Sequence, residues 1–516
     1  MGTKKKEVIV FLKKHKLLFT IIFLSLIGLI LRLLFIWKHS TAFTYDQGRD
    51  LLDLREMWLL HKPRLIGANT SLHGVFYGPF WYWLSFPFYL LTGGHPLTNL
   101  IPLLFLSWVM PIIFFFLIEN KRLGFILALV FIFSHSFFNH STVALNTNPI
   151  IFIIPLILLF LAKFYSSEKE IFLWLVMFSM ATSFHFEPII GLFLLPFFLI
   201  TILIFKKGRL VWKQKRASLA FLIPFIPQVI FECRHHFLQS QAFLNLLTGK
   251  GSSLTPASGG LVYRFFDRLR VFQDVWLNQS GEAILAILFL ILIALFSYQR
   301  KQKKEVKFLF LLCLLALAMF FIGFVIYPFA LWPWYLSAVD ALMLTLIGLA
   351  IFSLLSYKKR YFFLFLGILF IFIIINVIRY LPWPLEQGFS PDPANLRTRL
   401  KVVDLIYEDT NDKGFKVFTF APYVYDYPYQ YLIWWRAKTK HGYLPEEYTY
   451  LPNQPDYVPA KEAADKLIPS KKAECDYLII EPFESQEKWY WDWRYRFPEA
   501  RKIWEIGETR VEKLCD

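Results

Sequence analysis

A segment of mixed charge near the N-terminus is the first place in this chain of 516 residues where the residue types suit catalysis. Residues 44–56 read TYDQGRDLLDLRE, and spacings of three and four residues put four charged side chains on one helix face: Asp46, Arg49, Asp50 and Asp53. Asp46, at the start of that helix, is the candidate general base, and Arg49 and Asp50 are candidates for orienting an acceptor. A solvated amphipathic helix on a membrane surface is the alternative interpretation.

The tetrapeptide 185–188 (HFEP) is a polar break between two short apolar runs. His185 and Glu187 suit either the orientation of an acceptor hydroxyl or the binding of a divalent cation. Two ligands do not specify a metal site, so no metal is assigned. A polar turn ended by proline is the alternative interpretation.

Arginines gather after a later apolar run. The segment 231–236 (FECRHH) carries Arg234 between Glu232 and His235, which are further candidates for orienting an acceptor or a metal. Three more arginines follow in the same loop: Arg264, Arg268 and Arg270. Guanidinium groups bind phosphate through paired hydrogen bonds, so Arg234, and secondarily the later three, are expected to bind a phosphate. Anchoring to lipid headgroups is the alternative for the later three.

The composition indicates that lipid, not water, surrounds most of the chain. Hydrophobic residues make up 56% of it, against about 45–50% in soluble domains. The net charge of +17 does not indicate a nucleic-acid partner, because residues 1–381 hold 36 Lys and Arg against 15 Asp and Glu, while residues 382–516 hold 19 against 23. The positive charge therefore belongs to the apolar part, where it reports membrane topology.

A bilayer-spanning helix needs about 20 apolar residues, and fewer when the span is short. The apolar runs predict eleven spans, at residues 17–37, 97–118, 123–140, 148–163, 171–184, 188–205, 217–231, 283–298, 307–327, 335–355 and 361–381. Residues 76–92 are also apolar but contain Pro79 and Pro87, so a juxtamembrane or re-entrant segment is expected there. The predicted fold class is a mainly α, polytopic transmembrane helical bundle.

Basic residues mark alternate loops of this bundle. With the N-terminus inside, the cytoplasmic loops hold 24 basic residues against five acids. The positive-inside rule then places loops 38–96 and 232–282 and the C-terminal part outside the cytoplasm. We expect a multi-pass plasma-membrane protein in which residues 17–37 form a signal anchor.

Two charged residues lie within apolar runs. Arg32 is expected to extend its side chain to the outer interface, or to join the arginines that bind phosphate. Asp340, near the start of the tenth span, faces the same side.

The C-terminal part is predicted to be a small extracytoplasmic α/β domain, residues 394–516, after a Pro-rich linker at 382–393. Helices are expected at 394–410 and 428–439, and strands at 415–421, 476–481 and 502–506. Its many aromatic residues suit core packing, with sugar stacking as the alternative. Cys475 and Cys515 either pair or remain free thiols.

The order of these elements resembles a known superfamily. One span leads to an acidic residue at the start of an outside helix, then to residues 65–84 (LIGANTSLHGVFYGPFWYWL), and later to residues 227–235 (PQVIFECRH). This order is similar to that of the C-type glycosyltransferase superfamily, especially bacterial relatives of the protein O-mannosyltransferases and of the lipid A aminoarabinose transferases. The resemblance covers residues 1–381, the predicted transmembrane domain.

The resemblance implies an enzyme that moves a sugar, with inversion, from a polyprenyl-phosphate donor to an acceptor hydroxyl on the extracytoplasmic face. Asp46 matches the acidic residue that serves such enzymes as the catalytic base. Gln47 departs from the Glu that often follows it in mannosyltransferases, and Gly78 departs from the Lys that precedes the corresponding proline in aminoarabinose transferases. The resemblance leaves the acceptor open among glycan, lipid and protein.

A transporter or flippase of lipid-linked glycans is the alternative function. Such a protein should carry ionisable residues at the membrane midplane and show repeated halves. Here the sequence places the charges at one edge of the spans, and it shows no internal repeat. We therefore expect the glycosyltransferase.

Overall fold

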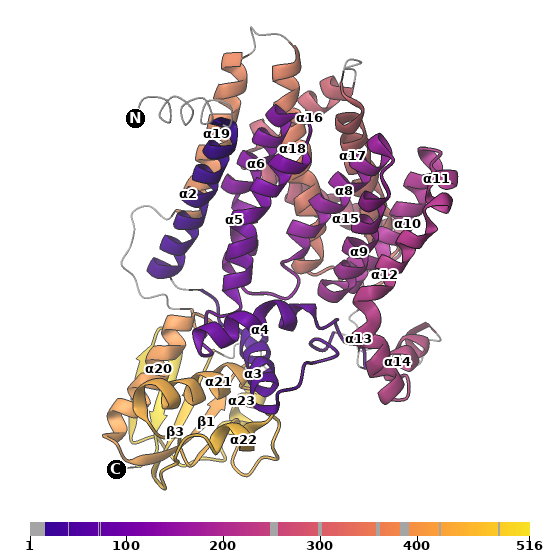
Figure 1. The fold of residues 1–516 in the computed structure, drawn as a ribbon. Helices are drawn as coiled ribbons and strands as arrows, with labels where there is room; N and C mark the ends of the chain where they lie inside the picture. Colours follow the sequence, from indigo (N-terminus) through magenta and orange to yellow (C-terminus); the bar gives the residue numbers. More distant parts are fainter. Residues whose placement is uncertain are drawn as a thin grey trace, which may run out of the picture.

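The computed structural model describes residues 16–39, 41–70, 72, 74–247, 256–257, 259–297, 302–357, 362–381, 392–422, 425–482 and 486–515. The basic N-terminal segment 1–15, the loop residues 298–301 and 358–361 and most of the predicted linker, 382–391, lie outside this range. The described residues form a helical bundle and a smaller domain built on a sheet (Figure 1).

Apolar helices of membrane-spanning length make up the bundle. Seven described helical segments are long and apolar enough to cross a membrane. They are α2 (Lys16–His39), α5 (Leu100–Leu117), α8 (Ile150–Ser167), the run of η1 (Lys215–Ser218), α12 (Leu219–Leu222), η2 (Ile223–Phe225) and α13 (Ile226–Arg234), α17 (Lys304–Ile326), η3 (Pro333–Leu336) with α18 (Ser337–Tyr357), and α19 (Phe362–Tyr380).

Two bent helix pairs and two shorter helices complete the bundle. The pairs are α6 (Lys121–Phe133) with α7 (His135–Thr142), bent by 58°, and α15 (Leu261–Ser280) with α16 (Ala283–Ser297), bent by 99°. The shorter apolar helices are α9 (Glu170–Phe186) and α10 (Pro188–Ile204). Counting each bent pair once gives nine described spans, and α9 and α10 match the remaining predicted runs, so the number of crossings stays a prediction.

Helix α18 is the centre of the bundle. Of its span, 89% is buried inside the protein, against 22% for α2 and 28% for α19. It contacts α6, α8, α15, α16, α17 and α19. Gly348 permits a close approach to α6, because a Cβ there would lie 2.4 Å from Leu127 Cδ2.

Two short helices, α3 (Tyr45–Leu60) and α4 (Phe80–Thr92), lie between the bundle and the C-terminal domain (Figure 1). The first is the helix expected from the charge spacing, with Thr44 as its N-cap. The second has 13 residues, too few to cross a bilayer, which agrees with the expected juxtamembrane or re-entrant segment.

The C-terminal domain is a five-stranded mixed sheet with helices. Its elements are α20 (Leu396–Thr410), β1 (Gly414–Phe420), α21 (Tyr427–Arg436), the π-helix η5 (Ala437–His441), β2 (Glu447–Thr449), α22 (Lys461–Asp465), β3 (Ala473–Ile480), α23 (Glu487–Arg494), β4 (Lys502–Ile506) and β5 (Thr509–Lys513). The strand order is β2-β1-β3-β5-β4. β1 is parallel to β2 and β3, and β5 is antiparallel to β3 and β4. The predicted α/β class is confirmed, although β2 and β5 were not expected from the sequence.

This domain is fixed on the end of the bundle that carries α3 and α4, hereafter the domain-side end. The Phe43 backbone N–H donates to the Ala394 carbonyl at 2.7 Å, and the Leu396 N–H donates to the Thr41 carbonyl at 2.9 Å. α3 also packs closely on α21, since a Cβ on Gly48 would meet the Pro428 nitrogen at 2.5 Å. The loop after α2 and the C-terminal domain therefore lie on one side, as the charge pattern predicts.

Cys475 and Cys515 form a disulfide that ties β3 to the end of the chain, with 5.3 Å between the two Cα atoms. Of the described cysteines, Cys233 is exposed and Cys313 is buried, and both are free. The pairing alternative for the two C-terminal cysteines is therefore the one that the structure adopts.

Replacing Cys515 by Ser should destabilise the C-terminal domain. The disulfide closes a loop of 40 residues. Cross-linking a loop of that length stabilises the folded state by about 4 kcal/mol, because it lowers the entropy of the unfolded chain. We expect a lower thermal midpoint in the Cys515→Ser protein and no further drop when reductant is added. A Cys233→Ser control should keep the wild-type midpoint and its sensitivity to reductant. Equal midpoints for wild type and Cys515→Ser would show that the disulfide contributes nothing.

Candidate active site

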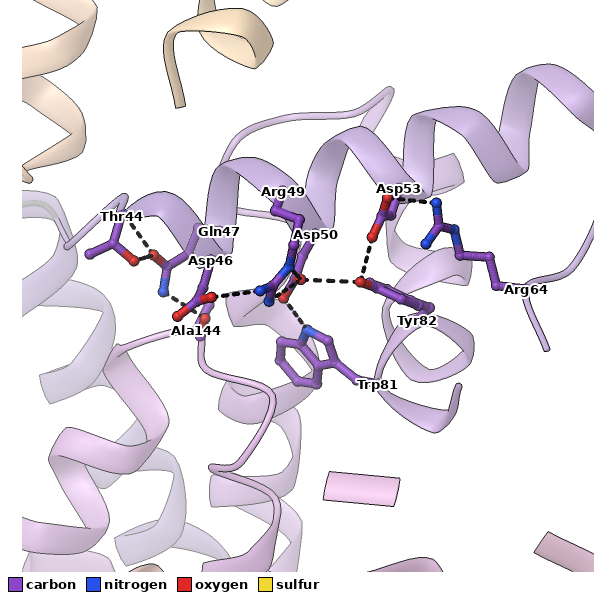
Figure 2. A network of polar contacts seen from close by, with 10 residues as sticks. All are labelled: Thr44, Asp46, Gln47, Arg49, Asp50, Asp53, Arg64, Trp81, Tyr82 and Ala144. Carbon is purple, nitrogen blue, oxygen red and sulfur yellow. Dashed lines mark hydrogen bonds and ion pairs between the residues drawn. The ribbon is translucent and has the colours of Figure 1, made fainter. Parts of the chain in front are cut away.

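The first turn of α3 holds Asp46 on a backbone that is fixed from both sides. Gln47 Oε1 accepts a hydrogen bond from the Thr44 N–H at 2.6 Å, which is one half of a capping box, and another from the Thr44 hydroxyl. Gln47 Nε2 donates to the Ala144 carbonyl, 2.7 Å away in the loop between α7 and α8. The helix start is thus tied to the bundle (Figure 2), and the Asp46 side chain stays 42% exposed.

Arg49 holds two carboxylates of this helix. Its Nη1 lies 2.8 Å from Asp46 Oδ1, and its Nη2 lies 2.8 Å from Asp50 Oδ1 (Figure 2). Burial raises the pKa of Asp50, the charge of Arg49 partly opposes this rise, and the resulting pKa is about 6. One guanidinium therefore fixes the exposed carboxylate of Asp46 and balances a buried one behind it.

A polar network joins the buried side of α3 to α4 (Figure 2). Trp81 Nε1 donates to Asp50 Oδ2 at 2.7 Å. The Tyr82 hydroxyl donates to Asp53 Oδ2 at 2.5 Å, and Arg64 pairs with the same carboxylate at 2.7 Å. Asp50 and Asp53 are thus committed to holding α4, which leaves Asp46 as the carboxylate of this face that is open to a substrate.

His185 is buried against the segment that leads into α4. Its ring centre lies 4.0 Å from that of Phe80, and it also faces the backbone of Pro224. Neither ring nitrogen makes a hydrogen bond of ordinary geometry with a described residue. Gly78 makes this approach possible, because a Cβ at that position would stand 2.0 Å from His185 Nδ1.

Glu187 is a buried carboxyl in the short connection between α9 and α10. Burial raises its pKa to about 8, against the opposing effects of hydrogen bonds from the Ile189 backbone and the Tyr77 hydroxyl. Its Oε2 has no hydrogen-bond partner among the described residues. Glu187 is therefore a neutral acid at pH 7, able to donate one proton or hydrogen bond.

Replacing Glu187 by Gln should change how stability depends on pH. The folded-state pKa of about 8 exceeds the ordinary value of 4.5, so the stability that Glu187 contributes is fully present below pH 4.5 and is lost as pH rises through 8. Gln does not ionise, so the free energy of unfolding of the variant, relative to that of wild type, should rise by about 3 kcal/mol between pH 5.5 and pH 8.5. Thermal midpoints of both proteins in detergent at the two pH values measure this, and a constant difference between them would refute the raised pKa.

Residues 76–80 contact the segments that carry two of the three groups of candidate residues, and Phe76 lines a small cavity together with Arg49 of the third group. The Phe76 ring lies 5.7 Å from that of Phe231, and the Phe76 N–H donates to Gln239 Oε1 at 3.0 Å. Tyr77 interacts electrostatically with residues of two of the groups: Glu187, Arg49 and Asp46. Residues 76–80 therefore contact the α9–α10 connection and α13–α14 while facing the start of α3.

Two of the residues that follow Phe231 serve the local structure. Both Glu232 carboxylate oxygens accept backbone N–H bonds from the start of α14 (Leu238–Leu247), at Gln239 (3.0 Å) and Ser240 (2.9 Å). His235 stacks on Phe231 at 4.0 Å and bonds its carbonyl through Nδ1 at 2.9 Å. Arg234 differs from both, because it is exposed and no described residue pairs with it.

The arginines of α15 are in different situations. Arg268 is buried, pairs with Asp267, and donates from Nη2 to the Phe329 carbonyl at 3.0 Å. Arg264 donates from Nη1 to the Ile326 carbonyl at 3.0 Å. Both hold α15 against the C-terminal end of α17, where carbonyls have no helical partner. Arg270 is exposed and has no described partner.

Arg32 does not extend to an interface, contrary to the expectation from its position. It is 1% exposed and donates from Nε to the Ser141 hydroxyl at 2.7 Å and from Nη1 to the Gly28 carbonyl at 2.8 Å. It also bonds the Ile132 carbonyl, which the break between α6 and α7 leaves free. The side chain therefore stabilises that bend, and its donors are used there instead of on a phosphate.

Sequence comparison finds no relative, since no family model and no curated protein matches the chain. Structural comparison does find similar folds. The crystal structure of ArnT from Cupriavidus metallidurans bound to undecaprenyl phosphate matches with a TM-score of 0.60 at 11% identity, over 96% of this chain and 97% of that chain. The apo structure of the same protein matches with a TM-score of 0.60 at 10% identity, with the same coverage. The chain has the fold of ArnT.

ArnT is a lipid A aminoarabinose transferase with a C-type glycosyltransferase fold, so the fold implied by the sequence resemblance is confirmed. The match extends beyond the first 381 residues and includes the C-terminal domain, because it covers nearly all of both chains. With its apolar helices, the ArnT fold makes this chain a multi-pass membrane protein.

The ArnT-like structure explains both departures from the family pattern. Gln47 uses its amide as donor and acceptor at once, toward Ala144 and Thr44, which a Glu cannot do. Gly78 leaves the space that the His185 ring fills, so a Lys at position 78 would displace His185.

Metal ligation finds little support. The described residues contain no group of three or more His, Cys, Asp and Glu side chains placed to hold a metal ion. His185 and Glu187 are neighbours in sequence, yet His185 stacks on Phe80 while Glu187 lies by Tyr77. The pair remains a candidate for orienting an acceptor hydroxyl.

Several residues of the described polar contacts gave no signal in the sequence. Tyr77 and Tyr82 stand in an apolar, aromatic stretch, where their hydroxyls resemble core residues with a polar end. His140 also went unnoticed, although its Nε2 lies 2.9 Å from Asp340, the acid singled out within the tenth run. The sequence held one related hint, because it placed Asp340 on the side of the outside loops, but it did not name a partner for Asp340.

Proposed function

We propose that this protein is an inverting membrane glycosyltransferase. It moves a hexosyl or pentosyl group from a polyprenyl-phosphate donor to an acceptor hydroxyl, on the extracytoplasmic face, with Asp46 as general base. Its partners are the lipid-linked donor, the surrounding membrane lipid and an acceptor that is a glycan, a lipid or a protein.

The observation that carries the proposal is the setting of Asp46. An exposed carboxylate, held by Arg49, stands at the domain-side end of an ArnT fold, where residues 76–80 bring together the polar connections of the bundle. The related structure of ArnT holds undecaprenyl phosphate, a polyprenyl phosphate, which supports a donor of that class. The ionisable groups described above cluster at this end, which favours the transferase over a transporter.

One inverting displacement accounts for the required chemistry. The acceptor oxygen attacks the anomeric carbon of the donor sugar while Asp46 takes the hydroxyl proton. The bond between the anomeric carbon and the phosphate oxygen breaks, and polyprenyl phosphate leaves with the electron pair. The leaving group is already a stable anion, so charge stabilisation by a guanidinium suffices and no strong acid is needed.

The disulfide supports the extracytoplasmic face. Disulfides persist in oxidising compartments and are rare in the cytosol. Cys475 and Cys515 pair within the C-terminal domain, which lies on the same side as α3 and Asp46. The positive-inside rule assigns that side to the exterior for independent reasons.

Arg234 is the candidate for the donor phosphate, since its guanidinium is exposed and unpaired among the described side chains. Arg234→Ala should weaken binding of undecaprenyl phosphate about tenfold to a hundredfold, the worth of a hydrogen bond to a charged group. Arg234→Lys should recover part of this loss, because Lys keeps the charge and loses the paired geometry. Titration of the purified protein with undecaprenyl phosphate, followed by thermal shift, measures the affinity.

Arg216 supplies a matched control, because it is exposed at the opposite end of the same broken span. Arg216→Ala should bind undecaprenyl phosphate as wild type does. Equal affinities for wild type and Arg234→Ala would remove Arg234 from the donor site and leave the exposed Arg270 as the remaining arginine of this group.

A further inference from the structure

A groove separate from Asp46 runs between the end of α3 and the outer side of α4. It encloses about 630 Å³. One wall is a single face of α4, where Trp83, Phe86, Pro87 and Leu90 recur at spacings of three and four residues. The other wall includes Trp58 of α3. The groove is therefore mostly apolar, with His61 and Lys62 as its polar lining residues, and its volume can hold part of a hydrocarbon chain.

The two sides of α4 have different roles. Its inner side is buried and carries the polar groups that bind α3, namely Trp81 and Tyr82. On its outer side, Trp83 is 37% exposed and Leu90 is 52% exposed. In a helix at the end of a transmembrane bundle, exposed apolar side chains face lipid, and tryptophan favours the headgroup level.

One lysine lines the groove at its α3 wall, and a second lies beside a tryptophan of that wall. Lys62 is the lining residue. Lys438, from the π-helix of the C-terminal domain, lies with Nζ 4.9 Å from the Trp58 ring centre. Neither ammonium group pairs with an acidic side chain among the described residues, in contrast to Arg64 nearby, which pairs with Asp53 and Glu56. The α3 wall of the groove thus has one cation in its lining, Lys62, and another next to Trp58, Lys438, and neither has an acidic partner among the described residues.

We propose that this groove binds an anionic phospholipid of the surrounding leaflet, with an acyl chain along α4 and the phosphate between Lys62 and Lys438. The charge and the apolar wall match the two parts of such a lipid. Because Lys62 follows α3 and Lys438 belongs to the C-terminal domain, the bound headgroup bridges the bundle and the domain. This inference does not depend on the proposed sugar transfer.

The test uses the purified full chain, stripped of lipid in detergent and titrated with phosphatidylglycerol or with phosphatidylcholine of the same acyl chains. Native mass spectrometry reports the lipid that is retained. Wild type should bind phosphatidylglycerol more tightly than phosphatidylcholine. Each lysine near an anionic headgroup is worth about a fivefold gain, so the Lys62→Gln/Lys438→Gln variant should lose about thirtyfold in phosphatidylglycerol affinity.

The control removes the same charge elsewhere on the C-terminal domain. Lys472 and Lys488 are exposed, and the Lys472→Gln/Lys488→Gln variant should retain phosphatidylglycerol as wild type does. A Leu90→Asp variant should weaken both lipids, because it places a charge on the apolar wall. Equal retention of the two lipids by wild type, or equal losses in the two double variants, would overturn the proposal.

Discussion

Replacing Asp46 by Asn should reduce sugar transfer by about 10²–10⁴-fold, the usual contribution of a general base. Asn has nearly the same shape and can still contact Arg49, so the start of α3 should keep its structure. Binding of undecaprenyl phosphate should therefore remain close to wild type, and the loss should appear in kcat. Turnover of a purified donor, measured beside donor affinity, separates the two effects.

Asp274 provides the control for this substitution. It is exposed on α15, carries the same functional group, and makes no hydrogen bond or ion pair with residues 76–80 among the described residues. Asp274→Asn should transfer sugar at the wild-type rate. A wild-type rate in Asp46→Asn would instead remove Asp46 from the mechanism, whatever the donor proves to be.

Replacing Gly78 by Ala should reduce sugar transfer as severely as Asp46→Asn does, but for a steric reason. The added Cβ would stand 2.0 Å from His185 Nδ1, far inside contact distance, and His185 is fully buried. Overpacking of a buried position costs about 1–3 kcal/mol, and here the displaced ring also supports Phe80 at the start of α4. We expect a lower thermal midpoint together with loss of transfer.

A second substitution distinguishes steric overlap from other effects of Ala. His185→Ala in the Gly78→Ala background removes the ring and should restore most of the thermal midpoint. Gly367→Ala is the matched control, since no atom lies within 4 Å of a Cβ there, and it should leave the midpoint unchanged or raised. A Gly78→Ala protein as stable as wild type would contradict the packing described for His185.

The local part of this site could be predicted from the sequence because local rules govern it. Thr44 before a polar run, and charges at intervals of three and four, predicted α3 and the shared face of its carboxylates. The charge asymmetry of the loops predicted that α3 and the C-terminal domain share one side. Hydrophobic runs located most helices of the bundle, including the two short ones, α9 and α10, but they missed α15, which lies within the predicted outside loop 232–282.

Pairings between distant segments could not be predicted in this way. Arg32 fits a snorkelling position by sequence, yet the bend between α6 and α7 offers it a free carbonyl at Ile132. Arg264 and Arg268 fit a phosphate site by composition, yet each donates to a backbone carbonyl at or just beyond the end of α17. In each case a backbone acceptor competes for the guanidinium, and only the tertiary structure reveals where that acceptor lies.

The short strands β2 and β5 illustrate a different limit. β2 has three residues and pairs only with β1, so it has no alternating pattern long enough to recognise. β5 (TRVEK) carries three charged residues in five and reads as a surface segment, although Glu512 is buried beside Arg494. Its strand conformation comes from pairing with β3 and β4.

Bond cleavage in the donor tests the central claim most directly. The purified protein in liposomes would receive a polyprenyl-phosphate sugar labelled in the sugar, together with an extract of cell-envelope acceptors. Free polyprenyl phosphate and labelled acceptor should appear in equal amounts, with inverted configuration at the anomeric carbon, and Asp46→Asn should yield neither. Movement of intact donor across the bilayer, with no cleavage and no effect of Asp46→Asn, would contradict the glycosyltransferase and favour a flippase.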